Sequence, residues 1–138
     1  RDLAEAVALQ KQALGKQFPA LSEEDWQRQT RALYREDKGQ LVPDYDPKLL
    51  KTLEAIDFSQ PLPTFWPQWR GLDRVPLMIL RGETSDVLSA ESVEAMCEGR
   101  TALTETVIIE GQGHPPLLES GGLPQRVKAF LAKVERLA

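Results

Sequence analysis

The chain has 138 residues, of which 41% are hydrophobic and 28% are charged, and its formal net charge is −4 with a sequence pI near 5.1. This composition is typical of one soluble globular domain with a modest hydrophobic core. The acidic balance argues against nucleic acid or an anionic membrane surface as a partner. No apolar run approaches the ~20 residues that span a bilayer, and we expect neither a membrane segment nor a secretory signal.

Cysteine and histidine are scarce. A single cysteine, Cys97, excludes an intramolecular disulfide, and a reducing, cytoplasmic location is expected. Because the chain has one histidine, His114, and one cysteine, these residues cannot supply a set of metal ligands at a recognisable spacing, so no metal site is expected. Gly111-Gln112-Gly113 lacks the rest of a dinucleotide-binding fingerprint, and no cofactor is expected. Because the chain begins with Arg1, we expect it to belong to something longer.

Two amphipathic helices are predicted at the start of the chain. The first covers residues 2–14 and ends near Gly15. The second has Ser22 as its N-cap, followed by three acidic residues that suit the positive end of the helix dipole. Its helical spacing predicts that it continues to about Glu36, before a turn at residues 37–39.

A third helix and a connector follow. Asp46-Pro47 is a helix start, with aspartate as the N-cap and proline at the first helical position. Four apolar side chains then line one side and are expected in the core, namely Leu49, Leu50, Leu53 and Ile56. Residues 58–74, rich in proline and aromatic side chains, are predicted to be a connector.

Two short apolar runs, Leu77 to Leu80 and Val107 to Ile109, have no polar alternation. That pattern is typical of strands buried on both faces of a parallel sheet. A helix capped by Ser89 is expected between them, with Cys97 buried on its apolar side. A last helix over residues 123–137 is expected to cover the sheet with an apolar stripe of Leu123, Val127, Phe130, Leu131 and Val134.

Each run ends in a glycine-containing turn that leads to an ionisable residue. Asp86 follows the first strand and His114 the second. Parallel neighbours point their carboxyl ends the same way, so both loops are expected at one edge of the sheet. A histidine that acts as a general base needs an acceptor on its other ring nitrogen, and Asp86 is a candidate acceptor. Taken alone, both residues are equally compatible with turn or solvated positions.

The stretches 76–89 and 111–118 resemble the α/β-hydrolases, specifically the carboxyl-terminal part of bacterial members that carry a helical cap. The resemblance implies an α/β fold in which two parallel strands with flanking helices are preceded by a helical cap segment. Residues 1–57 would be the cap, 58–74 the connector back to the core, and 75–138 the carboxyl-terminal part of the core. In the family's order of nucleophile, acid and histidine, the resemblance implies Asp86 as acid and His114 as base.

The nucleophile elbow, Gly-x-Ser-x-Gly, and an oxyanion-hole loop are absent from the sequence. The resemblance therefore implies a nucleophile outside this chain, and the chain alone is expected to be inactive. In capped members the connector re-enters the core beside the active-site mouth, so Trp66 and Trp69 are candidates to border the pocket for a small-molecule substrate. The alternative is that both tryptophans are packing anchors.

Two parallel strands with apolar faces cannot form a free-standing sheet. The expected partner is the missing amino-terminal half or a second copy of this chain through strand pairing, so self-association is expected. The function implied for the parent is esterase-like acyl hydrolysis by a Ser-His-Asp triad. Epoxide, haloalkane or carbon–carbon bond hydrolysis and a non-catalytic assembly module remain open.

Overall fold

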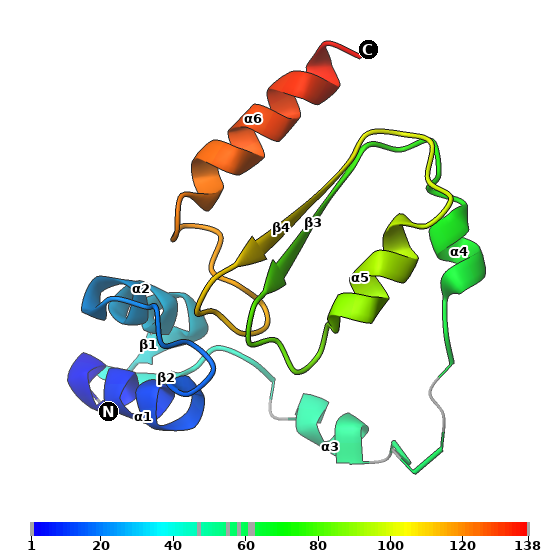
Figure 1. Cartoon of the computed structure of the whole chain (residues 1–138). Coiled ribbons are helices and arrows are strands. Elements are labelled where there is room, and N and C mark those ends of the chain that lie inside the picture. The colour runs from blue at the N-terminus through cyan, green and yellow to red at the C-terminus, as the bar shows by residue number, and fades with distance from the viewer. Residues whose placement is uncertain (1, 47, 55, 58, 61–62, 138) are drawn as a thin grey trace.

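The chain forms a helical part at its amino-terminal end and a parallel strand pair flanked by helices (Figure 1). A computed structural model describes residues 2–46, 48–54, 56–57, 59–60 and 63–137. The elements are, in chain order, α1 (Leu3–Leu14), α2 (Glu23–Leu33), β1 (Tyr34–Asp37), β2 (Gln40–Pro43), α3 (Lys48–Glu54), α4 (Trp66–Arg70), β3 (Leu77–Gly82), α5 (Ala90–Cys97), β4 (Thr104–Ile109) and α6 (Leu123–Glu135). Among the described residues, every helix is too short or too polar for a membrane crossing.

The first two helices start where their N-caps predict. Asp2 accepts a hydrogen bond from the Glu5 amide (2.8 Å), and a reciprocal capping box of Ser22 and Asp25 begins α2. The two helices enclose a small core of Val7, Phe18 and Trp26, with the rings of Phe18 and Trp26 edge to face at 6.3 Å between centroids. The two helices therefore share one buried cluster, while Leu9 on α1 and Leu33 on α2 stay exposed.

A β-hairpin replaces the predicted end of the second helix. α2 ends at Leu33 rather than near Glu36, and β1 pairs antiparallel with β2 in a register that sets Tyr34 opposite Pro43. The two residues between the strands, Lys38 and Gly39, both have positive φ angles, 51° and 73°. A two-residue turn of this kind matches the twist of paired strands and therefore favours a hairpin.

The third helix starts as predicted but is exposed. The Asp46 carboxylate accepts a hydrogen bond from the Lys48 amide at 2.9 Å, whereas Pro47 lies outside the described residues. The predicted burial is wrong for Leu49 and Ile56, which are 59% and 38% exposed, because α3 lies apart from both the strand pair and the first two helices (Figure 1). The side chains of Leu50 and Leu53 are outside the described part of the chain.

The predicted pair of parallel strands is confirmed. β3 and β4 run side by side in a register that extends from Leu77 opposite Thr104 to Gly82 opposite Ile109. α6 and α5 lie on opposite sides of the pair (Figure 1). On the α6 side, Leu123 packs against β4, and Lys133 pairs with Glu105 at 2.6 Å.

Three predicted burials around the strands differ from the structure. Ile108 in β4 is 65% exposed, because α5, on the side of the strand pair away from α6, leaves this side chain uncovered. Leu131 on α6 is 53% exposed, and α6 ends at Glu135 rather than Leu137. Cys97 is half-buried, because it stands at the last turn of α5.

Ser89 caps α5 as predicted, because its side chain accepts a hydrogen bond from the Ser92 amide. The division at residues 1–57, 58–74 and 75–138 stays a prediction.

Candidate active site

Asp86 and His114 lie in loops that leave neighbouring strands. We call residues 83–89 the Asp86 loop and residues 110–122 the His114 loop. The strand register sets Gly82, the last residue of β3, opposite Ile109, the last residue of β4. Both loops therefore start at the same edge of the strand pair.

Hydrogen bonds join the two loops directly. The Glu83 amide donates to the carbonyl oxygen of Ile109 at 2.9 Å, and the Thr84 amide donates to that of Gln112 at 3.0 Å. In return, the Gly111 amide donates to the Glu83 carboxylate at 2.8 Å. Three hydrogen bonds therefore join the starts of the two loops.

Glycine is needed where these loops approach most closely. A β-carbon on Gly82 would overlap the carbonyl oxygen of Gly113. A β-carbon on Gly113 would in turn lie only 2.9 Å from Cβ of Gln17 and 3.1 Å from Cε2 of Phe18. The two glycines thus allow three backbone segments to meet at the strand ends.

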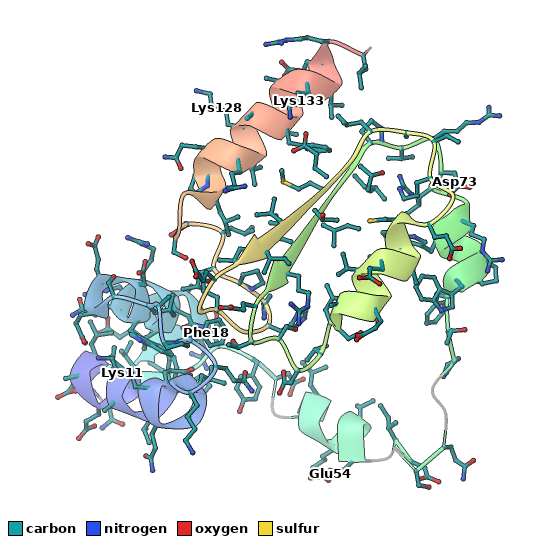
Figure 2. All side chains as sticks on the ribbon, in the orientation of Figure 1. Lys11, Phe18, Glu54, Asp73, Lys128 and Lys133 are labelled. Atoms are coloured by element: carbon teal, nitrogen blue, oxygen red, sulfur yellow. The ribbon has the colours of Figure 1, made fainter. Side chains whose placement is uncertain are left out.

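The third segment is the linker between α1 and α2, which holds both loops. The Thr84 hydroxyl donates to the Gln17 carbonyl at 2.6 Å, and the Gln17 side-chain amide donates to Asp86 Oδ2 at 2.9 Å. The Ala20 amide donates to the Gly111 carbonyl at 3.1 Å. Figure 2 labels Phe18 at this junction of the first two helices with the loops. The helical part is thereby anchored on the strand ends.

Gln112 shapes the rest of the His114 loop. Its side chain is only 2% exposed; Nε2 donates to the Ser120 hydroxyl at 2.6 Å, and Oε1 accepts from the Leu117 amide at 2.8 Å. The Ser120 hydroxyl donates to the Leu117 carbonyl at 3.0 Å. One buried amide side chain therefore satisfies both its donor and its acceptor within the loop that carries His114.

The structure brings Asp86 and His114 to the same edge but does not join them. Both residues are exposed. Among the described residues, Asp86 bonds to Gln17, and no hydrogen bond links Asp86 with His114. His114 lines a pocket of about 540 Å³ between α2 and its own loop.

The polar side of that pocket is held by ion pairs. Arg28 contacts Glu24 at 3.1 Å, Asp25 at 3.2 Å and Glu119 at 3.3 Å. The Ser22 hydroxyl, bonded to Asp25, is the main cause that lowers the pKa of that carboxyl below its ordinary value of 3.8, while partial burial opposes the shift. Asp25 is therefore ionised at neutral pH.

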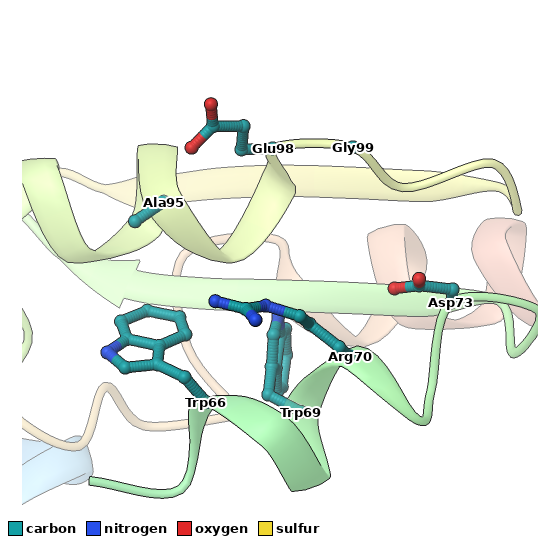
Figure 3. A pocket seen from close by; sticks show the side chains of 7 residues that line it. All are labelled: Trp66, Trp69, Arg70, Asp73, Ala95, Glu98 and Gly99. Carbon is teal, nitrogen blue, oxygen red and sulfur yellow. The ribbon is translucent and has the colours of Figure 1, made fainter.

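Trp66 and Trp69 lie elsewhere, on α4. They line a separate pocket of about 500 Å³ between α4 and the end of α5, in which Arg70 extends toward Trp66 (Figure 3). Trp69 Nε1 donates to the Met96 carbonyl at 2.9 Å, and the Arg100 guanidinium lies 5.7 Å from the Trp69 ring centroid. Neither Asp86 nor His114 lines this pocket. The contacts of Trp69 are those of a packing anchor.

The sequence reasoning missed three polar residues of the site, namely Gln17, Thr84 and Gln112. Gln112, between two glycines of a tight turn, gave a local hint of a constrained loop. The other two gave none, because their bond joins positions 67 residues apart. Within the described residues, no group of three histidine, cysteine or acidic side chains is close enough to hold a metal ion.

Solved structures provide the comparison with known proteins. An α/β hydrolase from Novosphingobium aromaticivorans matches 95% of this chain with a TM-score of 0.80 and 28% identity, and the match covers 46% of that protein. A structure from Rickettsia typhi described as a hydrolase matches 96% of the chain and 43% of its own length, with a TM-score of 0.70 and 21% identity. The thioesterase domain from the curacin biosynthetic pathway matches 95% of the chain and 43% of its own length, with a TM-score of 0.55 and 22% identity.

The chain spans less than half the length of each of these neighbours. No protein-family model matches the chain, and neither does any curated protein. The predicted resemblance to the carboxyl-terminal part of the α/β-hydrolases is confirmed by the structural matches. The chain therefore has part of an α/β-hydrolase fold, and its structural neighbours support a hydrolase family.

Proposed function

We propose that the chain supplies the acid and the base of a Ser-His-Asp triad for acyl hydrolysis, with the nucleophilic serine outside these residues. The observation that carries the proposal is the strand register, which sets Gly82 opposite Ile109 and so starts the Asp86 and His114 loops at one edge. Open α/β sheets hold their reacting groups at the carboxyl ends of strands. The order of acid before histidine along the chain agrees with this fold's triad.

In this mechanism His114 carries one proton from the nucleophile to the leaving group. The serine hydroxyl would attack an ester-like carbonyl, His114 would accept its proton, and the protonated imidazole would then return it to the leaving group. Asp86 would accept a hydrogen bond from the other ring nitrogen and stabilise the imidazolium. Backbone N–H groups outside this chain would hold the oxyanion.

The contact between Gln17 and Asp86 is compatible with that role. Gln17 uses only Oδ2 of the carboxylate. An ionised carboxylate accepts hydrogen bonds on both oxygens, so Oδ1 is available to an imidazole N–H. Gln17 would then fix the orientation of the carboxylate while His114 approaches from the neighbouring loop.

The substrates in this proposal are esters or thioesters of small acyl groups. One structural neighbour is a thioesterase domain, which supports including thioesters. Trp66 and Trp69, predicted to border the substrate pocket, line a separate pocket without His114, so this proposal assigns them to packing and keeps the substrate beside His114.

One apolar side chain of β4 is left uncovered on the face away from α6. Ile108 is largely exposed on β4, and the fold neighbours contain more than twice the length of this chain. We propose that the remaining part of a hydrolase fold covers this face, with strand pairing between two copies of this chain as the second candidate.

Hydrolysis of 4-nitrophenyl butyrate tests the triad. The samples are the 138-residue chain, the complete natural protein that contains it, and that protein with Asp86→Asn or His114→Ala. We expect no activity from the chain alone, and losses of about 10⁴-fold for Asp86→Asn and about 10⁶-fold for His114→Ala in the complete protein. Asp73→Asn, at a carboxylate in the Trp66 pocket, is the matched control and should stay near full activity.

Two results would overturn the assignment. One is hydrolysis by the 138-residue chain that survives His114→Ala. The other is a complete protein in which Asp86→Asn costs no more than Asp73→Asn.

A further inference from the structure

A chain of three hydrogen bonds runs from Asp86 to the loop that carries His114. The Asp86 carboxylate accepts from the Gln17 side chain at 2.9 Å, and the Gln17 carbonyl accepts from the Thr84 hydroxyl at 2.6 Å. The Thr84 amide donates at 3.0 Å to the carbonyl of Gln112, which precedes Gly113 and His114. Thr84 therefore lies in the middle of the path from the candidate acid to the candidate base.

Both hydrogen-bond donors of Thr84 belong to this path. Threonine has one amide N–H and one hydroxyl O–H. The first donates to the His114 loop and the second to the linker between α1 and α2. The hydroxyl bond holds the backbone of Gln17, from which the Gln17 side chain reaches Asp86. Among the described residues, the hydrogen bonds between this linker and the Asp86 loop are these two bonds of Gln17.

The separation between the linker and the two loops is limited in both directions. A β-carbon on Gly113 would lie only 2.9 Å from Cβ of Gln17, so the backbone of Gly113 leaves no room for a closer approach. The Thr84 hydroxyl, bonded to the Gln17 carbonyl, resists movement of the linker away from the loops. Gln17 is therefore held at one position from which its side chain orients Asp86.

We propose that Thr84 is a positioning residue of the triad, which holds the linker against both loops so that Gln17 presents the Asp86 carboxylate to His114. The inference rests on the proposed function, which assigns the acid and the base. Thr84 contacts neither the substrate nor the reacting atoms, and it acts through Gln17 and Asp86. The helical part of the chain then takes part in setting the geometry of the triad, in addition to lining the pocket beside His114.

Hydrolysis of 4-nitrophenyl butyrate by the complete natural protein tests the role of Thr84. Thr84→Val removes the hydroxyl and nearly keeps the shape of the side chain. We expect kcat to fall about tenfold and KM to change by less than about twofold, because a misplaced acid slows the chemical step and leaves substrate binding intact. Thr84→Ser keeps the hydroxyl and should return kcat to within about twofold of the wild-type value.

Thr101→Val is the matched control. Thr101 is also exposed, and its hydroxyl also donates to a backbone carbonyl, that of Asp73, at 3.4 Å. Because it precedes β4, it lies at the opposite end of the strand pair from the candidate site, and its loss should leave kcat unchanged. Near-ultraviolet circular dichroism checks folding, and Thr84→Ala replaces Thr84→Val if that spectrum changes.

A double variant separates positioning from a general loss of structure. In the Asp86→Ala background, Thr84→Val should lower kcat by less than about twofold, because the carboxylate that Gln17 orients is already gone. A purely structural role of Thr84 would lower kcat about tenfold in both backgrounds.

Three results would overturn the role of Thr84. They are full kcat in Thr84→Val while Asp86→Asn is impaired, an equal loss of kcat in Thr84→Ser, and an equal loss from Thr84→Val in the Asp86→Ala background. Each of these leaves the proposed triad intact. If Asp86→Asn keeps full activity, the triad and the role of Thr84 are both wrong.

Discussion

The two hydrophobic cores that the described residues form are closed to different degrees. In the first, Val7, Phe18 and Trp26 are enclosed between α1 and α2. In the second, Val107, Ile109 and Leu123 are buried between β4 and α6, yet Ile108 of the same strand faces outward. A helix has one apolar stripe, which a single partner can cover, whereas a parallel strand has two faces and needs two layers. The three side chains of the first core are therefore covered within this chain, whereas β4 leaves Ile108 uncovered.

Trp26→Ala should cause the largest loss of stability, because it removes one of the three buried side chains of the first core. Trp26 is buried against Phe18, and replacing a buried aromatic side chain by alanine costs about 3–5 kcal/mol. Urea denaturation measures the free energy of unfolding. Trp66→Ala, at a half-buried tryptophan, is the control and should cost clearly less. Equal losses would mean that the first core is no better closed than the surface of α4.

Gly82→Ala should break the second region where its loops meet. The added methyl group overlaps the Gly113 carbonyl, and crowding of this kind costs about 1–3 kcal/mol. We expect faster hydrogen exchange of the Thr84 amide, which bonds to Gln112. Gly71→Ala, at a glycine with a φ of −61° at the end of α4, is the control and should leave that amide protected. An unchanged Thr84 exchange rate in Gly82→Ala would contradict the close approach.

Ser22→Ala tests whether the first core depends on its own helix start. Loss of the cap should cost about 1 kcal/mol at pH 7. Because the Ser22 hydroxyl lowers the pKa of Asp25 in the folded state, the stability from that shift is present above the unfolded value near 4 and is lost as pH falls through the folded value. The difference between wild type and Ser22→Ala should therefore shrink on acidification. A difference in stability between the two proteins that grows at low pH would contradict the hydrogen bond between Ser22 and Asp25.

Gln17→Ala should weaken the link between the helical part and the Asp86 loop, with a small loss of stability. It removes the amide that donates to Asp86, an exposed hydrogen bond worth about 0.5–1 kcal/mol. Gln12→Ala, at an exposed residue on α1, is the control. In the complete protein we expect Gln17→Ala to lower kcat for 4-nitrophenyl butyrate more than it raises KM, because it disorients the acid. An effect confined to KM would instead place Gln17 in substrate binding.

Ile108→Thr should have the smallest effect on stability, and it tests the difference between the two cores most directly. In the 138-residue chain the side chain is largely exposed, so the free energy of unfolding should change by less than about 0.5 kcal/mol. Val107→Thr, one residue away and buried, should cost more. In the complete protein we expect Ile108→Thr to become clearly destabilising, since a covering layer would bury it. The same small change in both proteins would show that nothing packs on this face.

Local chemistry in the sequence was sufficient for much of the fold. Ser22 and Ser89 each bond an amide three residues away, so their helix starts were readable from a few neighbouring residues. The hairpin at residues 34–43 was missed, because the helical spacing of apolar residues runs on through Tyr34 and a turn at residues 37–39 fits a helix end as well as a hairpin. Leu49 was misplaced because an apolar stripe does not reveal whether a partner surface exists.

The candidate site was predictable only in part. Parallel pairing and the glycine turns led to the edge where Asp86 and His114 lie. The bond between Gln17 and Asp86 joins positions 69 residues apart, and no periodicity encodes such a contact. The role of α2 as a wall beside His114 was equally hidden, because packing between distant segments is a property of the folded chain.

The pocket beside His114 has one wall on α2 and the other on the His114 loop, whereas Asp86 and His114 both follow the strands. α2 contributes only a wall of this pocket, whereas the groups that would transfer protons in the proposed triad follow the strands. Exposed positions of α2 that turn toward the pocket are open to exchange without disturbing the strand register. Substrate range in a protein built this way would diversify by changes in one helix, long before the reaction itself changed.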